Sequence, residues 1–414
     1  MHILDFYRTE NKREELKQLL ILASQSHSDG LPDFFLEKDL WVTEILRILY
    51  DEKLLGDYAV AFKGGTALSK CWKTIDRFSE DIDLSIHWAD LAEAENEAAA
   101  WEKSIQSKSQ AKKFKDRQLE RLEEWSNQLV VDLNERFSAY EIDGLAANLV
   151  ESSKGEQIEV HFPKVTDSES NYHLDYVLLE FGGRNRGHPT HAHPISCYMA
   201  QVPELHEIEF PEAVVRAYDS NYIMWEKLTA LHQFSTMGKE PNSHRLARHW
   251  YDVDCMLSKA FADPIVSQLA MNDVIQMKKM RWPEKGVDYE LVSSGHLHLL
   301  PERERLENIA KDHQDAIEGR MFYSTKGPDS FEKITERISK AQDRINQTNS
   351  LRQIIEKTVR WDKAGAWMQA VITYEGKTYR SEMLLVDAPQ WGIKAHPERG
   401  INQLLGHLIS WKYP

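Results

Sequence analysis

The stretch from Phe62 to His87, FKGGTALSKCWKTIDRFSEDIDLSIH, constrains the fold of this chain more than any other part of the sequence. An apolar run, Tyr58–Phe62, leads into Gly64 and Gly65, and a segment compatible with a helix follows. The run Asp81–Ile86 then alternates polar and apolar side chains, which is typical of a strand with one buried face. The stretch therefore predicts a strand, a glycine turn, a helix and a second strand.

Two carboxylates on the second strand point to metal chemistry. Asp81 and Asp83 are two residues apart, so they project from the same face and repel each other unless a cation lies between them. Mg²⁺, with Mn²⁺ as an alternative, takes one or two carboxylates and leaves its other positions to water and phosphate. Gly64 and Gly65 let the backbone approach a phosphate, and a helix that starts near Thr66 would direct N–H groups at it. The combination predicts a site for a metal and a nucleotide.

Length and composition favour a globular protein of two or three domains. The 414 residues are 42% hydrophobic and 28% charged, which is enough for a sizeable core. The sequence has no apolar run of about 18 residues, and its N-terminus is charged where a signal peptide would be apolar. We therefore expect a cytoplasmic protein without membrane contact. The scattered Cys71, Cys197 and Cys255 indicate reduced thiols rather than a disulfide framework or a zinc cluster.

The charge balance restricts the class of partner. The net charge of −15 disfavours nonspecific nucleic-acid binding by the whole surface and favours a basic protein partner. Any RNA needs a local basic patch, and Lys108–Arg121 supplies one within the stretch 88–136, which lacks Pro and Gly and favours long helices. This basic segment is either a solvated helical face or an arm that contacts phosphates.

Several other segments carry charged residues whose roles the sequence leaves open. Helices are expected over Glu10–Ala23 and after Pro32, and the second contains Glu37, Lys38 and Asp39. These three charges are either solvated or support the site. Strands are expected over 158–162 and 176–181, and the second places Glu180 in an apolar run, where a lone carboxylate is costly.

Three close histidines follow the second of these strands. The segment GGRNRGHPTHAHP contains His188, His191 and His193, which could bind a metal, but its glycines and prolines predict a plain loop. Further helices are expected over Tyr218–Ser235 and around RHWYDVD. Near the C-terminus, two strands over 366–374 and 378–386, joined by Glu-Gly-Lys, indicate a small separate module.

The motifs together resemble a known enzyme family. The Gly-Gly turn and apolar-flanked Asp-x-Asp resemble the nucleotidyltransferase superfamily, whose third acid, on a later strand, is matched by Glu180 in LLEFG. The set FKGGTALSK, RFSEDIDLSI, LEKDLWVTEIL, MWEKLTALH and RHWYDVD resembles the AbiEii/AbiGii toxin family, which includes the MenT toxins, over roughly residues 31–346.

The resemblance implies an architecture and a set of site residues. It implies an α/β (α+β) fold with a polymerase-beta-like mixed-sheet core and a large helical C-terminal part, and with the small β-containing tail that the sequence pattern predicts outside the resemblance we expect domains at 1–215, 216–349 and 350–414. The catalytic residues that it implies are Asp81, Asp83, Lys227 and Asp252, with Asp81, Asp83 and Glu180 on the metal. The nucleotide would contact Gly64, Gly65, Thr66, Ser79 and Lys227, of which Ser79 is the serine of the family's Ser-x-Asp-x-Asp signature.

The resemblance also implies a reaction and partners. A nucleotide would pass from a nucleoside triphosphate to an acceptor hydroxyl, at the 3′ end of tRNA in several members, and pyrophosphate would leave. Translation and growth would stop, as in abortive infection and phage defence, and a cognate antitoxin would hold the toxin in check. Two alternatives stay open: nucleotidylation or phosphorylation of a protein, either the antitoxin or Ser79 itself, and a non-catalytic defence scaffold.

Overall fold

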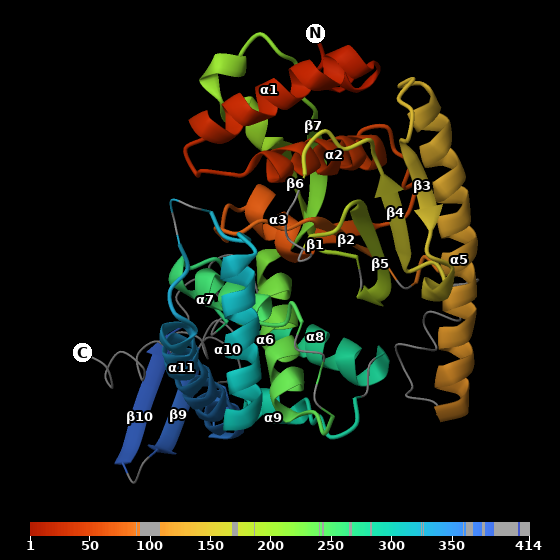
Figure 1. Cartoon of the computed structure of the whole chain (residues 1–414). Coiled ribbons are helices and arrows are strands. Elements are labelled where there is room, and N and C mark those ends of the chain that lie inside the picture. Colours follow the sequence, from red (N-terminus) through yellow and green to blue (C-terminus); the bar gives the residue numbers. More distant parts are fainter. Residues whose placement is uncertain are drawn as a thin grey trace.

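The computed structural model of the chain combines a mixed sheet with two groups of helices (Figure 1). It describes residues 1–87, 89–91, 108–167, 173–185, 187–239, 241, 244–264, 267–281, 284–323, 325, 327–358, 360–361, 367–374, 377–384 and 405. Among these, no helix is long and apolar enough to cross a membrane.

A seven-stranded sheet forms the core of the N-terminal half, in the order β3-β4-β5-β2-β1-β7-β6. β2 lies near its middle and pairs antiparallel with β1 and parallel with β5. The mixed α/β fold class expected from the sequence is confirmed, as is the strand, helix, strand order around the glycines, although the helix begins at Gly64 and includes both glycines. The strands are β1 (Val60–Lys63), β2 (Asp81–His87), β3 (Ala146–Leu149), β4 (Gln157–His161), β5 (Val177–Asn185), β6 (Thr190–Ser196) and β7 (Glu212–Tyr218).

The N-terminal helices α1 (Glu10–Ser26) and α2 (Asp33–Tyr50) pack on one another, and α2 packs on β7. The apolar stripe of α2 is fully buried, which gives this helix its place in the first hydrophobic core. Figure 1 shows α1 and α2 above the sheet and α5 (Lys108–Ser138) along its β3 edge. Part of the expected helical insertion, residues 92–107, lies outside the described residues.

The later helices form a second hydrophobic core below the sheet in Figure 1. Trp225 of α6 and Trp250 of α7 are fully buried in it, together with Phe78 from the segment before β2. The helices of this part are α3 (Gly64–Lys70) at the joint with the sheet, then α6 (Ser220–Thr236), α7 (Arg248–Ser258), α8 (Gln268–Arg281), α9 (Glu290–Ser293), α10 (Arg303–Glu318) and α11 (Phe331–Thr358). Four short 3₁₀ helices complete the set: Ile3–Tyr7, Glu151–Ser153, Tyr198–Gln201 and Pro203–Leu205.

Backbone hydrogen bonds join the segment before β2 to the helical part. The amide of Phe78 donates to the carbonyl of Met321 at 2.9 Å, and the amide of Tyr323 donates to the carbonyl of Asp76 at 3.1 Å. The helical part is therefore anchored only a few residues upstream of the two strand aspartates.

The expectation of a plain loop after Phe181 is wrong. β5 continues to Asn185, and β6 begins at Thr190 and pairs along its length with β7. β6 is an edge strand, so Pro194 costs it no hydrogen bond that an inner strand would need, and sequence signals for a turn misled the prediction. His191 contacts Asp219, and His193 packs against Trp72 with the two rings tilted, so these histidines make separate contacts.

The C-terminal segment adds a small antiparallel sheet of β8 (Arg360–Trp361), β9 (Trp367–Tyr374) and β10 (Lys377–Leu384). The expected hairpin between β9 and β10 is confirmed, with Tyr374 opposite Lys377, although residues 375–376 of its turn lie outside the described residues. α11 runs through position 350, where the change in sequence texture suggested a boundary.

Candidate active site

Three carboxylates share one face of the sheet. Asp83 on β2 is the register partner of Glu180 on the parallel neighbour β5, so their side chains lie on the same face, with Asp81 two residues before Asp83. The alternate residues Ile82 and Leu84 are buried in the core on the other face. Burial of these two side chains therefore turns the aspartates toward the helical part.

The electrostatics of the two aspartates indicate a cation site. Burial, reinforced by Glu80 and Glu180, raises the pKa of Asp81 to about 6. Burial, Glu180 and Asp81 raise the pKa of Asp83 to about 7, although two lysines act in the opposite direction. Oδ1 of Asp81 is buried without a hydrogen-bond partner. A bound cation would relieve both the repulsion and the unpaired oxygen.

Asp81 and Asp83 fit a Mg²⁺ ion that takes its remaining ligands from water and phosphate. No three His, Cys, Asp or Glu side chains within the described ranges are placed to hold an ion together, so the three acids do not form a closed cluster. Oε1 of Glu180 accepts a hydrogen bond from Gln157 Nε2 at 3.0 Å. Two carboxylates are nevertheless sufficient for Mg²⁺ that keeps water and phosphate as its other ligands. Asp81 and Asp83 meet that requirement.

The glycine pair makes room for side chains of the site. Gly64 has a φ of +75°, and a Cβ atom there would collide with the carboxylate of Asp83. A Cβ atom on Gly65 would lie 2.5 Å from Ser79 Oγ and 2.8 Å from Arg77 Nη2. Both positions thus require glycine so that α3 can pack against the segment leading into β2. In this structure, the absence of these two side chains makes room for the carboxylate of Asp83 and the hydroxyl of Ser79.

Thr66 fixes the start of β2. Its hydroxyl donates a hydrogen bond of 2.5 Å to the backbone carbonyl of Asp81, and its side chain is buried. Thr66 therefore holds the backbone of a candidate metal ligand in this structure.

Asp252 lies in an ion cluster that sequence reasoning did not foresee. It is fully buried, and the guanidinium of Arg77 binds both of its oxygens, at 2.7 and 2.8 Å. Lys227 Nζ donates to Oδ2 at 2.8 Å. Burial alone would raise the pKa of Asp252, but the two cations outweigh it and hold that pKa well below its usual range. The structure thus brings Lys227 and Asp252 together as a bonded pair.

Lys63 was also missed by sequence reasoning. It ends β1 directly before the glycines and is the register partner of Asp83. Its Nζ lies 3.1 Å from an oxygen of Glu226, which precedes Lys227 on α6. The sequence signal was present in FKGG, but a single strand lysine is ordinarily a solvated residue.

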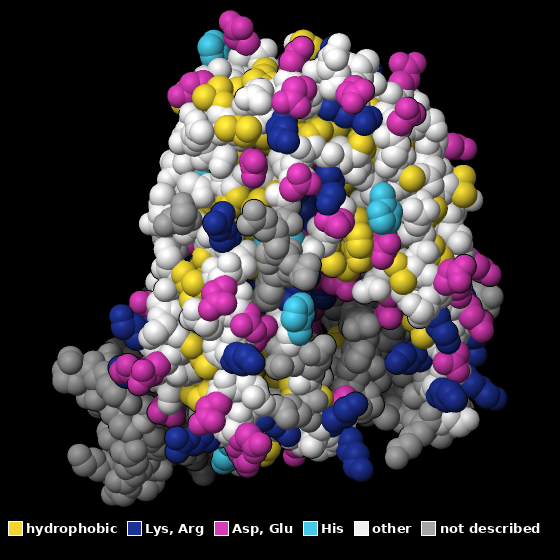
Figure 2. All heavy atoms as spheres, viewed as in Figure 1, with side chains coloured by type: hydrophobic (Ala, Val, Ile, Leu, Met, Phe, Trp, Pro, Cys, Tyr) yellow, Lys and Arg dark blue, Asp and Glu magenta, His cyan; other side chains and the backbone are white. Residues whose placement is uncertain are grey.

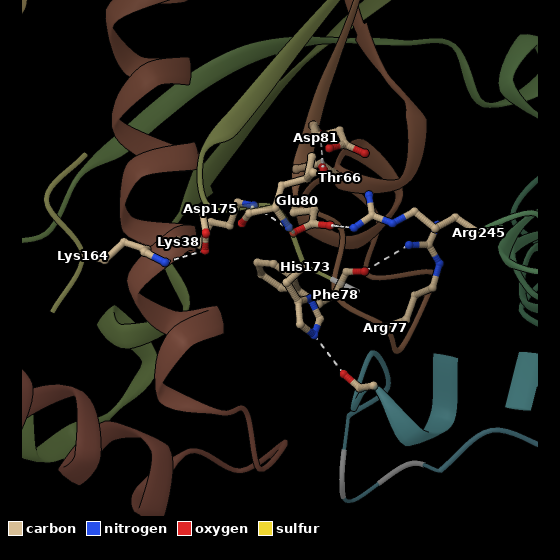
Figure 3. Close-up of polar contacts among 12 residues, drawn as sticks. Lys38, Thr66, Arg77, Phe78, Glu80, Asp81, Lys164, His173, Asp175 and Arg245 are labelled. Carbon is tan, nitrogen blue, oxygen red and sulfur yellow. Dashed lines mark hydrogen bonds and ion pairs between the residues drawn. The ribbon is translucent and has the colours of Figure 1, made fainter. Parts of the chain in front are cut away.

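Glu80, the residue before Asp81, is a second buried ionic centre (Figure 3). It has no exposed surface, and Lys38 and Arg245 bind it at 2.8 and 2.5 Å. Burial alone would raise the pKa of Glu80, but these two cations outweigh it and lower that pKa. Figure 3 shows Lys38 and Arg245 approaching Glu80 from different segments, beside Thr66 and Asp81.

The charges of the LEKDL segment are buried, so the interpretation that they are solvated is wrong. Glu37 accepts hydrogen bonds from the amides of Val165 and Thr166, at 2.8 and 3.0 Å. Asp39 binds Lys70 of α3 at 2.5 Å, and Lys38 binds Glu80. α2 therefore supports both the helix and the strand that carry the site.

The basic segment lies on the first half of α5. Lys112, Lys113, Lys115 and Arg117 are exposed there. Figure 2 shows Lys and Arg side chains gathered at the lower right, where Figure 1 places the lower end of α5. The exposure of these residues is compatible with both roles considered from the sequence.

Comparison with known proteins shows a match of the chain to a protein family. The family model described as "Nucleotidyl transferase AbiEii toxin, Type IV TA system" matches residues 47–361, which include all the candidate site residues. No curated protein matches the sequence. Among solved structures, the chain is similar to MenT4, a nucleotidyltransferase toxin from Mycobacterium tuberculosis H37Rv, with 15% identity, a TM-score of 0.41, and coverage of 80% of this chain and 98% of that chain.

Proposed function

The chain belongs to the AbiEii family of nucleotidyl transferase toxins of type IV toxin–antitoxin systems, and from this premise we propose that it transfers a nucleotide to the 3′ end of tRNA. The donor is a nucleoside triphosphate, and the acceptor is a terminal ribose hydroxyl. The observation that carries the proposal is the shared face of Asp83 and Glu180, with Asp81 beside them and with Lys63 and Lys227 within electrostatic reach of Asp83. Such a face suits a metal-bound polyphosphate.

In the proposed reaction, the acceptor oxygen attacks the α-phosphorus and the bond to the β-phosphate oxygen breaks. Pyrophosphate leaves, and the hydroxyl proton passes to the solvent. Asp81 and Asp83 would hold Mg²⁺ or Mn²⁺, with Glu180 as the third carboxylate on the same face, and a bound ion would supply neutralisation of the negative charge on the phosphate oxygens. Lys227 contacts the phosphates as a compact point charge. The backbone at Gly64 and Gly65, with Thr66 and Ser79, borders this nucleotide site.

The contacts of Asp252 favour a supporting role in the proposed site. Its carboxylate is fully buried and bound by Arg77 and Lys227, so it faces these two cations. We assign it the task of positioning Lys227. Its low pKa keeps it charged, so the lysine is held in place over the whole physiological range.

The family implies an antitoxin partner. We propose that the cognate antitoxin presents a basic surface, since this chain carries a net charge of −15. The reaction would take place in the cytoplasm, where tRNA is found.

The test is incubation of the purified protein with each labelled nucleoside triphosphate, Mg²⁺ and total tRNA, followed by separation on denaturing gels. Label should appear on tRNA, and it should be lost with Asp83→Asn and with tRNA whose 3′ hydroxyls have been oxidised by periodate. Label on a protein in place of RNA would replace the tRNA acceptor by a protein. If no label is transferred and Asp81→Ala is as toxic as the parent in cells, the protein is a non-catalytic scaffold.

A further inference from the structure

Lys63 lies on the active face of the sheet. Residues paired across neighbouring strands point to the same side, and Lys63 is paired with Asp83 in the antiparallel β1–β2 ladder. Its side chain therefore begins next to the carboxylates proposed to hold the metal, and 23% of it remains exposed. A ligand at the carboxylates can reach its ammonium group.

The contact of Lys63 with Glu226 connects the sheet to α6. The two groups are 3.1 Å apart, and both are partly exposed, at 23% and 22%. Lys227, the next residue of α6, binds Asp252. Two consecutive residues of α6 thus form ion pairs. Glu226 holds Lys63 of β1, and Lys227 is itself held by Asp252.

The charges around Asp83 single out the same two lysines. Lys63 and Lys227 both interact electrostatically with the carboxylate of Asp83. The field of each lysine therefore reaches the carboxylate. Lys63 comes from the sheet and Lys227 from the helical part, so a polyphosphate placed at Asp83 would lie within reach of two cations from different parts of the protein.

Glu226 can release Lys63 at low cost. A partly exposed ion pair contributes little to stability, because water solvates both groups well. Lys278 of α8 also lies within electrostatic reach of Glu226. Glu226 would therefore keep a cation nearby after Lys63 has moved to another anion.

From this geometry we propose that Lys63 is a second phosphate-binding residue, which Glu226 holds in the free enzyme and releases to the triphosphate of the bound nucleotide. The inference rests on the proposed function, since it names a further contact of the same nucleotide site. The triphosphate is clamped between Lys63 on β1 and Lys227 on α6, which ties the two parts of the protein together when nucleotide binds.

The test compares two variants whose effects should have opposite signs. The probe is a fluorescent nucleoside triphosphate with a methylene group between the α- and β-phosphorus, bound in the presence of Mg²⁺. Lys63→Met keeps the apolar stem and removes the charge, so its Kd should rise by about tenfold to a hundredfold, as for one charge-assisted contact. Glu226→Gln removes the competing anion, so its Kd should fall by about twofold to fivefold.

A matched control separates this effect from general loss of charge. Lys279 follows Lys278 on α8 and pairs with the exposed Glu290. Lys279→Met should therefore leave the Kd unchanged. Melting temperatures of all variants establish that each is folded.

The outcomes distinguish the inference from the proposed function. If Lys63→Met binds the probe as the parent does while Lys227→Met does not, Lys63 is no phosphate ligand and the proposed function stands. If Lys63→Met and Glu226→Gln both lower the melting temperature and leave the Kd unchanged, the pair is only a structural bridge between β1 and α6. If the parent protein binds no nucleotide, the proposed function is wrong, and the inference about Lys63 is wrong with it.

Discussion

Arg77 and Asp252 are 175 residues apart in the sequence and form a two-pronged ion pair in the protein interior, with N–O distances of 2.7 and 2.8 Å. Arg77 belongs to the segment before β2, and Asp252 lies on α7. The planar guanidinium matches the carboxylate geometry, which a lysine could not do. The pair therefore joins the carboxylate strand to the helix that positions Lys227.

We expect Arg77→Met to destabilise the protein by about 3–5 kcal/mol, because it leaves a buried carboxylate with one cation fewer. The measurement is unfolding in urea. The double variant Arg77→Met/Asp252→Leu should recover much of this loss, since an apolar pair can replace a buried ion pair. Nucleotide transfer should be lost in the double variant, because Lys227 no longer has the carboxylate of Asp252 to hold it in place.

The neighbouring pair between Arg337 and Asp254 on α7 is the control. Arg337 lies 2.6 Å from Asp254, but its side chain is 40% exposed. Asp254 is itself buried, but water can reach the place that Arg337 would leave, so Arg337→Met should cost less than Arg77→Met, about 1–2 kcal/mol. Equal losses for Arg77→Met and Arg337→Met would contradict a special role for the buried pair.

The strand aspartates should make the metal-free protein less stable as pH rises. Asp83 has a pKa of about 7 in the folded protein, above that of an unfolded aspartate, so the folded state binds more protons between about pH 4 and pH 7. Stability therefore falls as pH rises through this window. Asp83→Asn should raise the melting temperature by about 2–4 °C at pH 8 in EDTA, with no difference near pH 4.

The same melting temperatures, measured with added Mg²⁺, test whether Asp83 binds the metal. At pH 8 it should raise the melting temperature of the parent and have little effect on Asp83→Asn. Asp116→Asn, at an exposed position of α5, should respond as the parent does. An equal response of the parent and Asp83→Asn to Mg²⁺ would remove Asp83 from the metal site.

Local patterns in the sequence predicted the centre of the fold. The alternation in Asp81–Ile86 and the glycines before it are short-range signals, and they correspond to β2 and the turn into α3. The pairing of Asp83 with Glu180 depends on strand register, which no local pattern specifies, so the sequence singled out Glu180 as an unusual strand carboxylate but only family resemblance connected it with the aspartates. β6 was missed because an edge strand tolerates the Pro194 that argues against a strand elsewhere.

The ionic partners of the site could not be predicted for another reason. Arg77, Lys63 and Glu80 are ordinary charged residues in sequence, and such residues are mostly exposed in proteins. Their ion pairs with α6, α7 and Arg245 are formed only when distant segments pack together. The sequence thus indicated the carboxylates and, through the family resemblance, Lys227, but not Arg77 or Lys63.

Arg245 should act as a positioning residue for Asp81. Its φ of +63° is unusual, and Asp312 of α10 stabilises this turn by accepting hydrogen bonds from the amides of Arg245 and Ala247, both at 2.7 Å. Its guanidinium then binds Glu80, the residue before Asp81. Arg245→Met should raise the Mg²⁺ concentration for half-maximal activity by about 10–100-fold, as for other residues that orient metal ligands.

The shape of the Mg²⁺ dependence separates positioning from general damage. Excess Mg²⁺ should restore much of the activity of Arg245→Met, and Arg245→Lys should need less Mg²⁺ than Arg245→Met. Asp312→Asn should shift the dependence in the same direction but less, since an amide oxygen still accepts hydrogen bonds. A drop in activity that Mg²⁺ does not alter would show that Arg245 matters only for folding.

The basic face of α5 should bind the acceptor RNA. Lys112, Lys113 and Lys115 are exposed and form a local positive surface on an acidic protein. Replacing all three by alanine should raise KM for tRNA several-fold and reduce its salt dependence by about 0.7–0.9 in the log–log slope per lost phosphate contact. Nucleotide affinity should not change, and the exposed Lys333 and Lys340 of α11 provide the control. An unchanged KM for tRNA would leave α5 with a solvated face and place acceptor binding elsewhere on the protein.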